Sequence, residues 1–178
     1  MKAVILLLVV IVVGCGESSP TVEIDNSWIE RKIREKINKP EGELTEADLG
    51  KVMEIGWSGS DVYAKRTPAF ELLVEKFTGL ESLHLTSMDL TEVPKGLEKL
   101  SKLTKLDLRG NELEDVKGLE KLTQLRQLDL TYNRDLYKDQ IDELQKALPK
   151  CIIKSNPHWH SAPYGPRFGG KPSLGGNR

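Results

Sequence analysis

The chain has 178 residues, of which 38% are hydrophobic, and its formal net charge at pH 7 is −1. This length and composition predict one globular domain of modest size, and the near-zero net charge gives no reason to expect nucleic acid as a partner. Charge is nevertheless uneven along the chain, because residues 15–153 hold 21 of the 26 basic residues and all 27 acidic ones, a net charge of −6. The two cysteines, Cys15 and Cys151, are too few for a disulfide framework.

The first 14 residues have the pattern of a secretory signal. Lys2 precedes an apolar run over residues 3–13, which is shorter than the roughly 20 apolar residues that span a bilayer. The run ends in V-V-G-C (residues 12–15), which resembles the lipobox of bacterial lipoproteins, although two valines stand where Leu and a small residue are usual. The resemblance implies cleavage before Cys15, acylation of its sulfur and of the new amino group, and a lipid anchor in the cell envelope. Gly16, rather than Asp, favours the outer membrane if the source is Gram-negative. The alternative is a plain secretory peptide or an uncleaved anchor.

Residues 15–25 are expected to form a tether, and residues 26–50 a helical cap. In the cap, apolar residues at near-helical spacing predict a helix over residues 27–39, with Asn26 or Ser27 as its N-cap and a Pro-Glu-Gly segment at its end.

A second short helix is expected to follow, with Thr45 as its N-cap and Asp48 at the third helical position, an acidic variant of the capping box. A basic amphipathic helix followed by such a segment resembles the N-terminal cap of internalin-like bacterial repeat proteins. A cap is physically required, because the first repeat would otherwise expose its apolar face to water.

One hydrophobic pattern is written three times between residues 80 and 136. The copies are L-E-S-L-H-L-T-S-M-D-L (80–90), L-T-K-L-D-L-R-G-N-E-L (103–113) and L-R-Q-L-D-L-T-Y-N (125–133), with the last apolar position of the third copy slipped to Leu136. Their starts are 23 and 22 residues apart, inside the 20–29 range of leucine-rich repeats, and they match the consensus L-x-x-L-x-L-x-x-N-x-L. This part of the chain therefore resembles the leucine-rich repeat family.

The repeat has a physical logic. In each L-x-L the leucines share one side of a short strand, and the residue between them faces the other side. Asn111 and Asn133 stand where the chain turns off the strand, and an amide there can satisfy backbone groups of the neighbouring turn. Apolar residues three apart in the returning half, such as Val116, Leu119 and Leu122, favour a short 3₁₀ or helical segment.

A segment before the three copies fits the same template with other residues. V-M-E-I-G-W-S-G-S-D-V (52–62) holds every apolar position, with Ser60 at the asparagine site. The longer connection to the next copy is expected to contain a helix after Pro68, on the convex side.

A fifth strand is expected in L-P-K-C-I-I (148–153), with Cys151 and Ile153 inward, after a helix over residues 138–148. Cys151 is then a small buried hydrophobe, and a reactive thiol is the alternative. The fold prediction is an α/β leucine-rich repeat solenoid over residues 51–153, with about five short parallel strands and helical or 3₁₀ convex segments.

Residues 154–178 are expected to be a disordered basic tail, because they are rich in Gly and Pro and lack apolar periodicity. His158 and His160 could ligate a metal, but two imidazoles on a flexible tail make a weak site. No metal site or cofactor is therefore expected.

The residues between and beside the strand leucines face away from the core, on the concave side of the solenoid, and we term them the strand face. Its middle column is expected to read Gly56, His84, Asp107, Asp129 and Ile152. The candidate partner-binding residues are His84, Thr86, Lys105, Asp107, Arg109, Gln127, Asp129, Thr131 and Tyr132. Neighbouring strands lie about 4.8 Å apart, so Asp107 and Asp129 should be adjacent, with Lys105 and Arg109 offsetting their repulsion. This surface suits a polar or basic protein partner, and a solvated face without a partner is the alternative.

The sequence contains no recognisable nucleophile–base–orienter set, phosphate-binding glycine loop or zinc motif, so neither enzymatic activity nor a small-molecule substrate is expected. By analogy with other solenoids, the favoured function is a non-catalytic protein-interaction module carried by a cell-envelope lipoprotein. The alternative is a structural envelope lipoprotein whose basic tail contacts anionic polymer or lipid.

Overall fold

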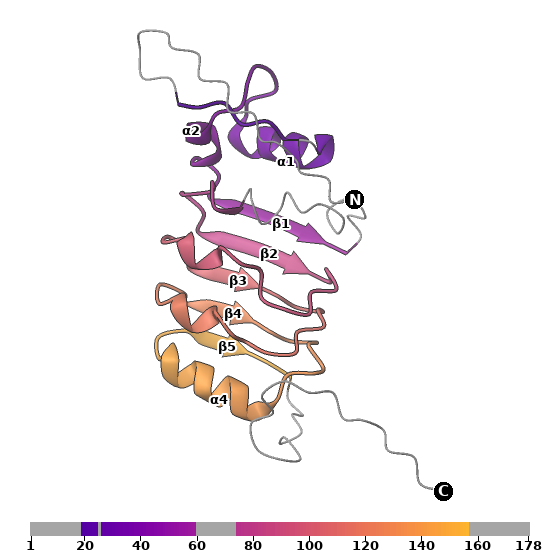
Figure 1. Cartoon of the computed structure of the whole chain (residues 1–178), viewed down its shortest axis with the longest axis vertical. Coiled ribbons are helices and arrows are strands. Elements are labelled where there is room, and N and C mark those ends of the chain that lie inside the picture. Colours follow the sequence, from indigo (N-terminus) through magenta and orange to yellow (C-terminus); the bar gives the residue numbers. More distant parts are fainter. Residues whose placement is uncertain (1–18, 25, 60–73, 157–178) are drawn as a thin grey trace, which may run out of the picture.

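A single five-stranded parallel sheet organises the protein, whose computed structural model describes residues 19–24, 26–59 and 74–156 (Figure 1). The strands are β1 (Glu54–Ser58), β2 (Ser82–Thr86), β3 (Lys105–Asp107), β4 (Gln127–Asp129) and β5 (Ile152–Lys154). They stack in chain order, each parallel to the next. The predicted solenoid with one short strand per repeat is confirmed.

The core of the solenoid is the column of apolar side chains on the inner side of this sheet. Residues along β1 to β4 alternate, so the apolar residues within each strand or directly after it point inward and become buried. These residues, all at most 2% exposed, are Ile55, Trp57, Leu83, Leu85, Leu106, Leu108, Leu128 and Leu130. Each buried leucine contributes about 1.5–3 kcal/mol relative to an exposed one, which makes stacking of neighbouring repeats favourable.

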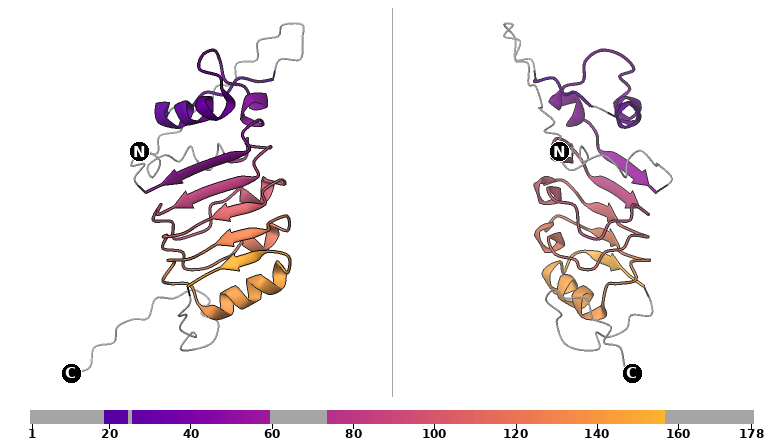
Figure 2. Two further views of the ribbon diagram at one scale, coloured as in Figure 1. Left: turned by 180° about the vertical axis from the view of Figure 1, so that it is seen from behind. Right: turned by 45° about the vertical axis from the view of Figure 1, so that its right-hand side comes forward.

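The return segments lie on the opposite side of the core from the sheet (Figure 2). They contain two 3₁₀ turns, η2 (Leu97–Lys99) and η3 (Leu119–Lys121), and the helix α4 (Lys138–Ala147). The apolar spacing of three residues in these segments therefore predicted the local structure correctly. A glycine with positive φ precedes each 3₁₀ turn, Gly96 at 89° and Gly118 at 93°.

The N-terminal cap consists of α1 (Ser27–Ile37) and α2 (Glu46–Leu49), above β1 in Figure 1. Asn26 caps α1 by accepting hydrogen bonds from two backbone amides, and Ile29 and Ile33 are buried against the core. The helix ends two residues earlier than predicted, because Asn38 adopts a left-handed conformation with φ of 54°. The nearby segment 19–24 pairs with the cap through a bridge between Thr21 and Thr45.

The cap is fastened by a buried carboxylate. Asp48 is 5% exposed, and its oxygens lie 2.7 Å from Lys39 Nζ and 2.8 Å from Lys51 Nζ. It also completes the predicted capping box, since it accepts hydrogen bonds from the hydroxyl and the amide of Thr45. Hydrogen bonds from Lys39, Lys51 and Thr45 hold the pKa of Asp48 well below its usual range, against the opposing effect of burial.

The fifth strand corrects one detail of the prediction. The repeat pattern predicts Ile152 beside Asp129, whereas the sheet pairs Lys154 with Asp129 and Ile152 with Gln127. Hydrogen bonds from Ile152 N to Arg126 O and from Leu130 N to Lys154 O fix this register. A shift of two residues preserves the inward and outward faces, so the apolar pattern alone could not decide between the two registers.

The buried position of Cys151 is confirmed, since it is 4% exposed, and burial raises the pKa of its thiol. Several other expectations concern residues outside the described ranges: the signal and Cys15, Ser60, the helix after Pro68, and the tail beyond residue 156. Within the described part of the chain, no helix is long and apolar enough to cross a bilayer.

Candidate functional site

The structure brings the central residues of the strand face together in one row. Gly56, His84, Asp107 and Asp129 occupy adjacent register positions on β1 to β4, and Lys154 completes the row on β5. The glycine makes room for the histidine, because a Cβ at position 56 would lie 2.9 Å from the Cβ of His84.

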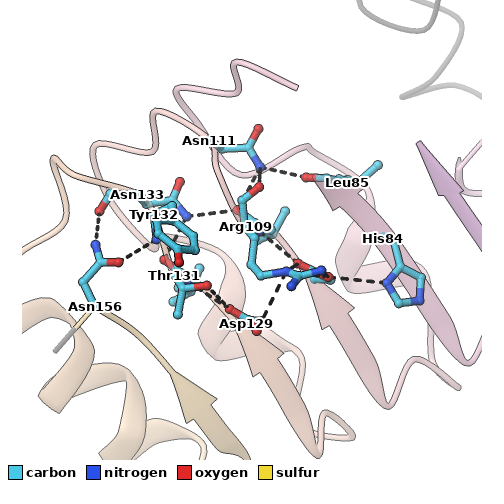
Figure 3. A network of polar contacts seen from close by, with 12 residues as sticks. His84, Leu85, Arg109, Asn111, Asp129, Thr131, Tyr132, Asn133 and Asn156 are labelled. Carbon is cyan, nitrogen blue, oxygen red and sulfur yellow. Dashed lines mark hydrogen bonds and ion pairs between the residues drawn. The ribbon is translucent and has the colours of Figure 1, made fainter. Parts of the chain in front are cut away.

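Arg109 joins the two predicted aspartates (Figure 3). Its Nε lies 3.0 Å from both carboxylate oxygens of Asp107, and a terminal guanidinium nitrogen lies 2.8 Å from one of them. The same Nε is 4.0 Å from Asp129 Oδ2. The Asp107 carboxylate raises the pKa of the Arg109 guanidinium, and Asp129 adds to this effect. The predicted neutralisation of the carboxylate pair therefore occurs, with arginine as its main agent.

Both aspartates also accept hydrogen bonds from the residue two positions later, just after the end of their own strand. Asp107 Oδ1 accepts the backbone amide of Arg109 at 3.0 Å. Asp129 Oδ1 accepts the amide of Thr131 at 3.0 Å and its hydroxyl at 2.6 Å. These local hydrogen bonds shape the turn after each strand and leave the carboxylates few free acceptor positions for a ligand.

A serine that the sequence analysis did not single out lies beside His84. Ser82 Oγ is 3.1 Å from His84 Nε2, and His84 Nδ1 is 3.6 Å from Asp107 Oδ2. The order resembles a nucleophile, base and orienter, which only the strand pairing could reveal, because Asp107 lies far away in the sequence. Ser82 is, however, 8% exposed, and its own amide is bonded to Met53 O, so it does not supply an oxyanion hole. The arrangement orients the imidazole on the strand face.

The remaining groups surround a shallow depression of about 250 Å³ over β2 to β5. Lys105, Gln127, Ile152 and Lys154 line it together with His84 and the two aspartates. Neither lysine ammonium forms an ion pair with any described residue. Ile152 is 66% exposed although it is apolar. These side chains are therefore available to a ligand.

Tyr132 stands at the rim of the strand face in an unusual conformation. It is 71% exposed, and its φ of 63° lies in the left-handed region, where the preceding repeat has Gly110 at 68°. A bulky residue in this region costs of order 1–3 kcal/mol, and it keeps this conformation only where contacts with its surroundings offset the strain. Asn156 provides such a contact, because its side-chain oxygen accepts the Tyr132 amide at 2.6 Å.

The side-chain amides of three asparagines, Asn111, Asn133 and Asn156, form a row of hydrogen bonds beside Tyr132 (Figure 3). Asn111 donates to Leu85 O at 2.7 Å and to Leu108 O at 2.8 Å, and it accepts the amides of Met88 and Leu90. Asn133 repeats the pattern one turn later, and Asn156 donates to its backbone oxygen at 3.2 Å. The predicted role of the repeat asparagines is confirmed, and it fixes where each strand-face residue emerges.

Five of the nine candidate residues line the depression, namely His84, Lys105, Asp107, Gln127 and Asp129. The other four lie outside its lining: Thr86, Arg109, Thr131 and Tyr132. Among residues 19–24, 26–59 and 74–156, no three His, Cys, Asp or Glu side chains are grouped so that they could hold a metal ion.

A model of the leucine rich repeat family matches residues 78–134. A comparison with curated proteins gives no match. Solved structures that resemble the chain include a leucine-rich repeat protein of Leptospira interrogans, with 30% identity, 46% of this chain and 21% of that chain covered, and a TM-score of 0.41. A second is internalin C2 of Listeria monocytogenes, with 19% sequence identity and a TM-score of 0.49. The match covers 70% of this chain and 51% of the internalin chain.

Another internalin of the same species, InlF, has 22% sequence identity and a TM-score of 0.52. The match covers 72% of this chain and 35% of the InlF chain. The chain thus spans between about a fifth and a half of the length of these proteins. The family match and the sheet together make the fold a leucine-rich repeat solenoid of the kind found in bacterial proteins.

Proposed function

We propose that this leucine-rich repeat solenoid is a non-catalytic binding module of a lipid-anchored cell-envelope protein, and that it binds another protein through the strand face. Solenoids of this kind use their extended strand surface for binding. The observation that carries the proposal is the depression over β2 to β5, where lysine, glutamine and isoleucine side chains lack partners within the described chain. The exposed Tyr132 at its rim adds an aromatic group of the type enriched at interfaces.

The non-catalytic part of the proposal is supported by how the polar groups are used. Asp107 and Asp129 accept hydrogen bonds from Arg109, Thr131 and backbone amides, and Ser82 is buried with its own amide bonded to Met53 O. Groups held this way stabilise a surface rather than transfer protons. The strand face therefore suits recognition more than chemistry.

The anchoring part is supported by the lipobox-like segment that ends at Cys15. Two or three acyl chains would hold the protein stably at a membrane, since each buried methylene contributes about 0.8 kcal/mol. Gly16 favours the outer membrane in a Gram-negative source. Cells grown with a labelled fatty acid test this: the wild-type protein incorporates label and Cys15→Ser does not. Equal incorporation in both proteins would rule out acylation at this cysteine.

The binding part is tested by blocking the depression without changing its charge. Gln127→Trp places a bulky side chain over β4, whereas Gln124→Trp places the same side chain on the exposed loop before the strand. After crosslinking in the native envelope, Gln127→Trp should reduce recovery of the partner at least about tenfold, equivalent to 1.4 kcal/mol. Gln124→Trp and deletion of residues 157–178 should leave recovery unchanged. Loss of recovery on tail deletion alone would contradict the proposal.

A further inference from the structure

The charges that line the depression differ in how far they are already neutralised. Asp107 accepts two guanidinium nitrogens of Arg109 at 3.0 and 2.8 Å, and Asp129 accepts both the hydroxyl and the amide of Thr131. In contrast, Lys105 and Lys154 are exposed, and no carboxylate of the described chain lies within 4.0 Å of either ammonium group. Asp107 and Asp129 share the charge of Arg109, and the two lysines raise the count to three cations against two carboxylates, so the net charge of this surface is positive.

An apolar group lies close to both cations, level with Lys105 in the register and two residues before Lys154 on β5. Ile152 pairs in register with Gln127, and both line the depression. A single exposed apolar residue is common on protein surfaces. This one has a stiff β-branched side chain in the lining of a depression that it shares with both lysines, so covering it would release water from a preformed contact.

The spacing of the cations defines the shape of what could bind them. Lys105 and Lys154 are two strands apart and displaced by two residues along the strands, which corresponds to about 12 Å between their Cα atoms at 4.8 Å per strand and 3.3 Å per residue. In an extended segment, residues i and i+4 share one face and lie about 13 Å apart, with residue i+2 between them on the same face.

We infer that the strand face binds an extended acidic segment in which two carboxylates, four residues apart, flank an apolar residue. The carboxylates pair with Lys105 and Lys154, and the apolar residue lies against Ile152. This inference rests on the proposed function and assigns the chemistry of its partner. It revises the polar or basic partner expected from the sequence, because a cation brought to the aspartates would compete with Arg109 and meet two unpaired lysines.

The test measures the binding of fluorescein-labelled peptides to the full-length purified chain by fluorescence anisotropy. The acidic peptide STETLTETS is compared with STQTLTQTS and STKTLTKTS, which keep the leucine and change only the flanking charges. Wild type should bind the acidic peptide about tenfold more tightly than the glutamine peptide, as expected for two exposed ion pairs, and the preference should shrink in high salt. Lys105→Glu with Lys154→Glu should abolish this preference and favour the lysine peptide.

A matched control reverses two other exposed lysines, Lys95 and Lys121, which lie on return segments. Lys95→Glu with Lys121→Glu makes the same change in net charge and should keep the preference for the acidic peptide. Replacing the peptide leucine by serine should weaken binding several-fold in wild type and much less in Ile152→Ser, because the contact is then already lost.

Equal binding of the three peptides, tighter binding of the lysine peptide to wild type, or no binding of the acidic peptide at about 1 mM would overturn the inference. So would an equal loss of preference in the control variant. None of these results touches the proposed function, which stands or falls separately on whether Gln127→Trp blocks partner recovery.

Discussion

The contribution of the buried Asn111 amide to the stability of the solenoid can be measured. Asn111→Ala removes a partner from five backbone groups, namely the carbonyls of Leu85, Leu108 and Arg109 and the amides of Met88 and Leu90. Two of the carbonyls keep a second donor, because Asn133 Nδ2 lies 3.0 Å from Leu108 O and the Ser87 amide lies 2.9 Å from Arg109 O. Three groups are therefore left without a protein partner.

A buried polar group without a partner costs about 1–3 kcal/mol, and water can reach the two partly buried amides. We expect Asn111→Ala to lower the free energy of unfolding by about 3 kcal/mol, a large share of the 5–15 kcal/mol typical of a domain. Asn111→Leu should cost about as much, since it fills the space but forms no hydrogen bond. Asn156→Ala, at the solvent-accessible end of the row of asparagines, should cost about 1 kcal/mol.

Urea unfolding followed by circular dichroism measures all three variants in the full chain. Two results would show that the hydrogen bonds of Asn111 do not stabilise the fold as described. One is a loss of unfolding free energy below about 1 kcal/mol for Asn111→Ala, and the other is a much smaller loss for Asn111→Leu than for Asn111→Ala. The second result would mean that volume, and not hydrogen bonding, makes this position important.

Three further predictions concern the cap, the rim and the serine. Asp48→Asn should lower the free energy of unfolding at pH 7 by about 2 kcal/mol, because it loses two ion pairs and a capping contact. The pKa of Asp48 is lower in the folded state than in the unfolded state, so its contribution is present above about pH 4 and is lost as pH falls further. Wild type should therefore lose more stability than Asp48→Asn below that pH in urea titrations, and parallel profiles would contradict this. Tyr132→Gly should leave the free energy of unfolding unchanged or raise it by up to about 1 kcal/mol, because relief of the left-handed strain offsets the greater conformational entropy of glycine in the unfolded chain. A clear loss of stability would show that Tyr132 is not strained. A fluorophosphonate probe should not label Ser82 in the native protein, as measured by intact mass, and stoichiometric labelling would show a reactive serine.

The inner side of the fold followed closely from the sequence. The period of two within each L-x-L segment fixes which strand residues point inward, and the regular distance between copies fixes the register of β2, β3 and β4. The capping box at Thr45 and Asp48 was also readable, because its chemistry depends on residues three positions apart.

The outer side followed less closely, because its contacts join residues that are distant in the chain. Three consecutive apolar residues, Cys151, Ile152 and Ile153, stand at the start of β5, so a two-residue slip leaves the pattern equally satisfied and only hydrogen bonds decide the register. The distances from His84 to Ser82 and Asp107 depend on strand pairing. The sequence displays two aspartates and two lysines on the strand face, but which of them remain unpaired depends on where Arg109 points.

The sharpest test of binding through the strand face is site-specific photo-crosslinking in the native envelope. A photoreactive phenylalanine analogue at Thr86 or Tyr132 reports contacts of the strand face beside the depression without filling it, and the same residue at Lys121 or at Trp159 reports the return side and the tail. Binding through the strand face predicts a discrete crosslinked product from the first two positions and none from the last two. A product from Trp159 or Lys121, with none from Thr86 or Tyr132, would contradict it.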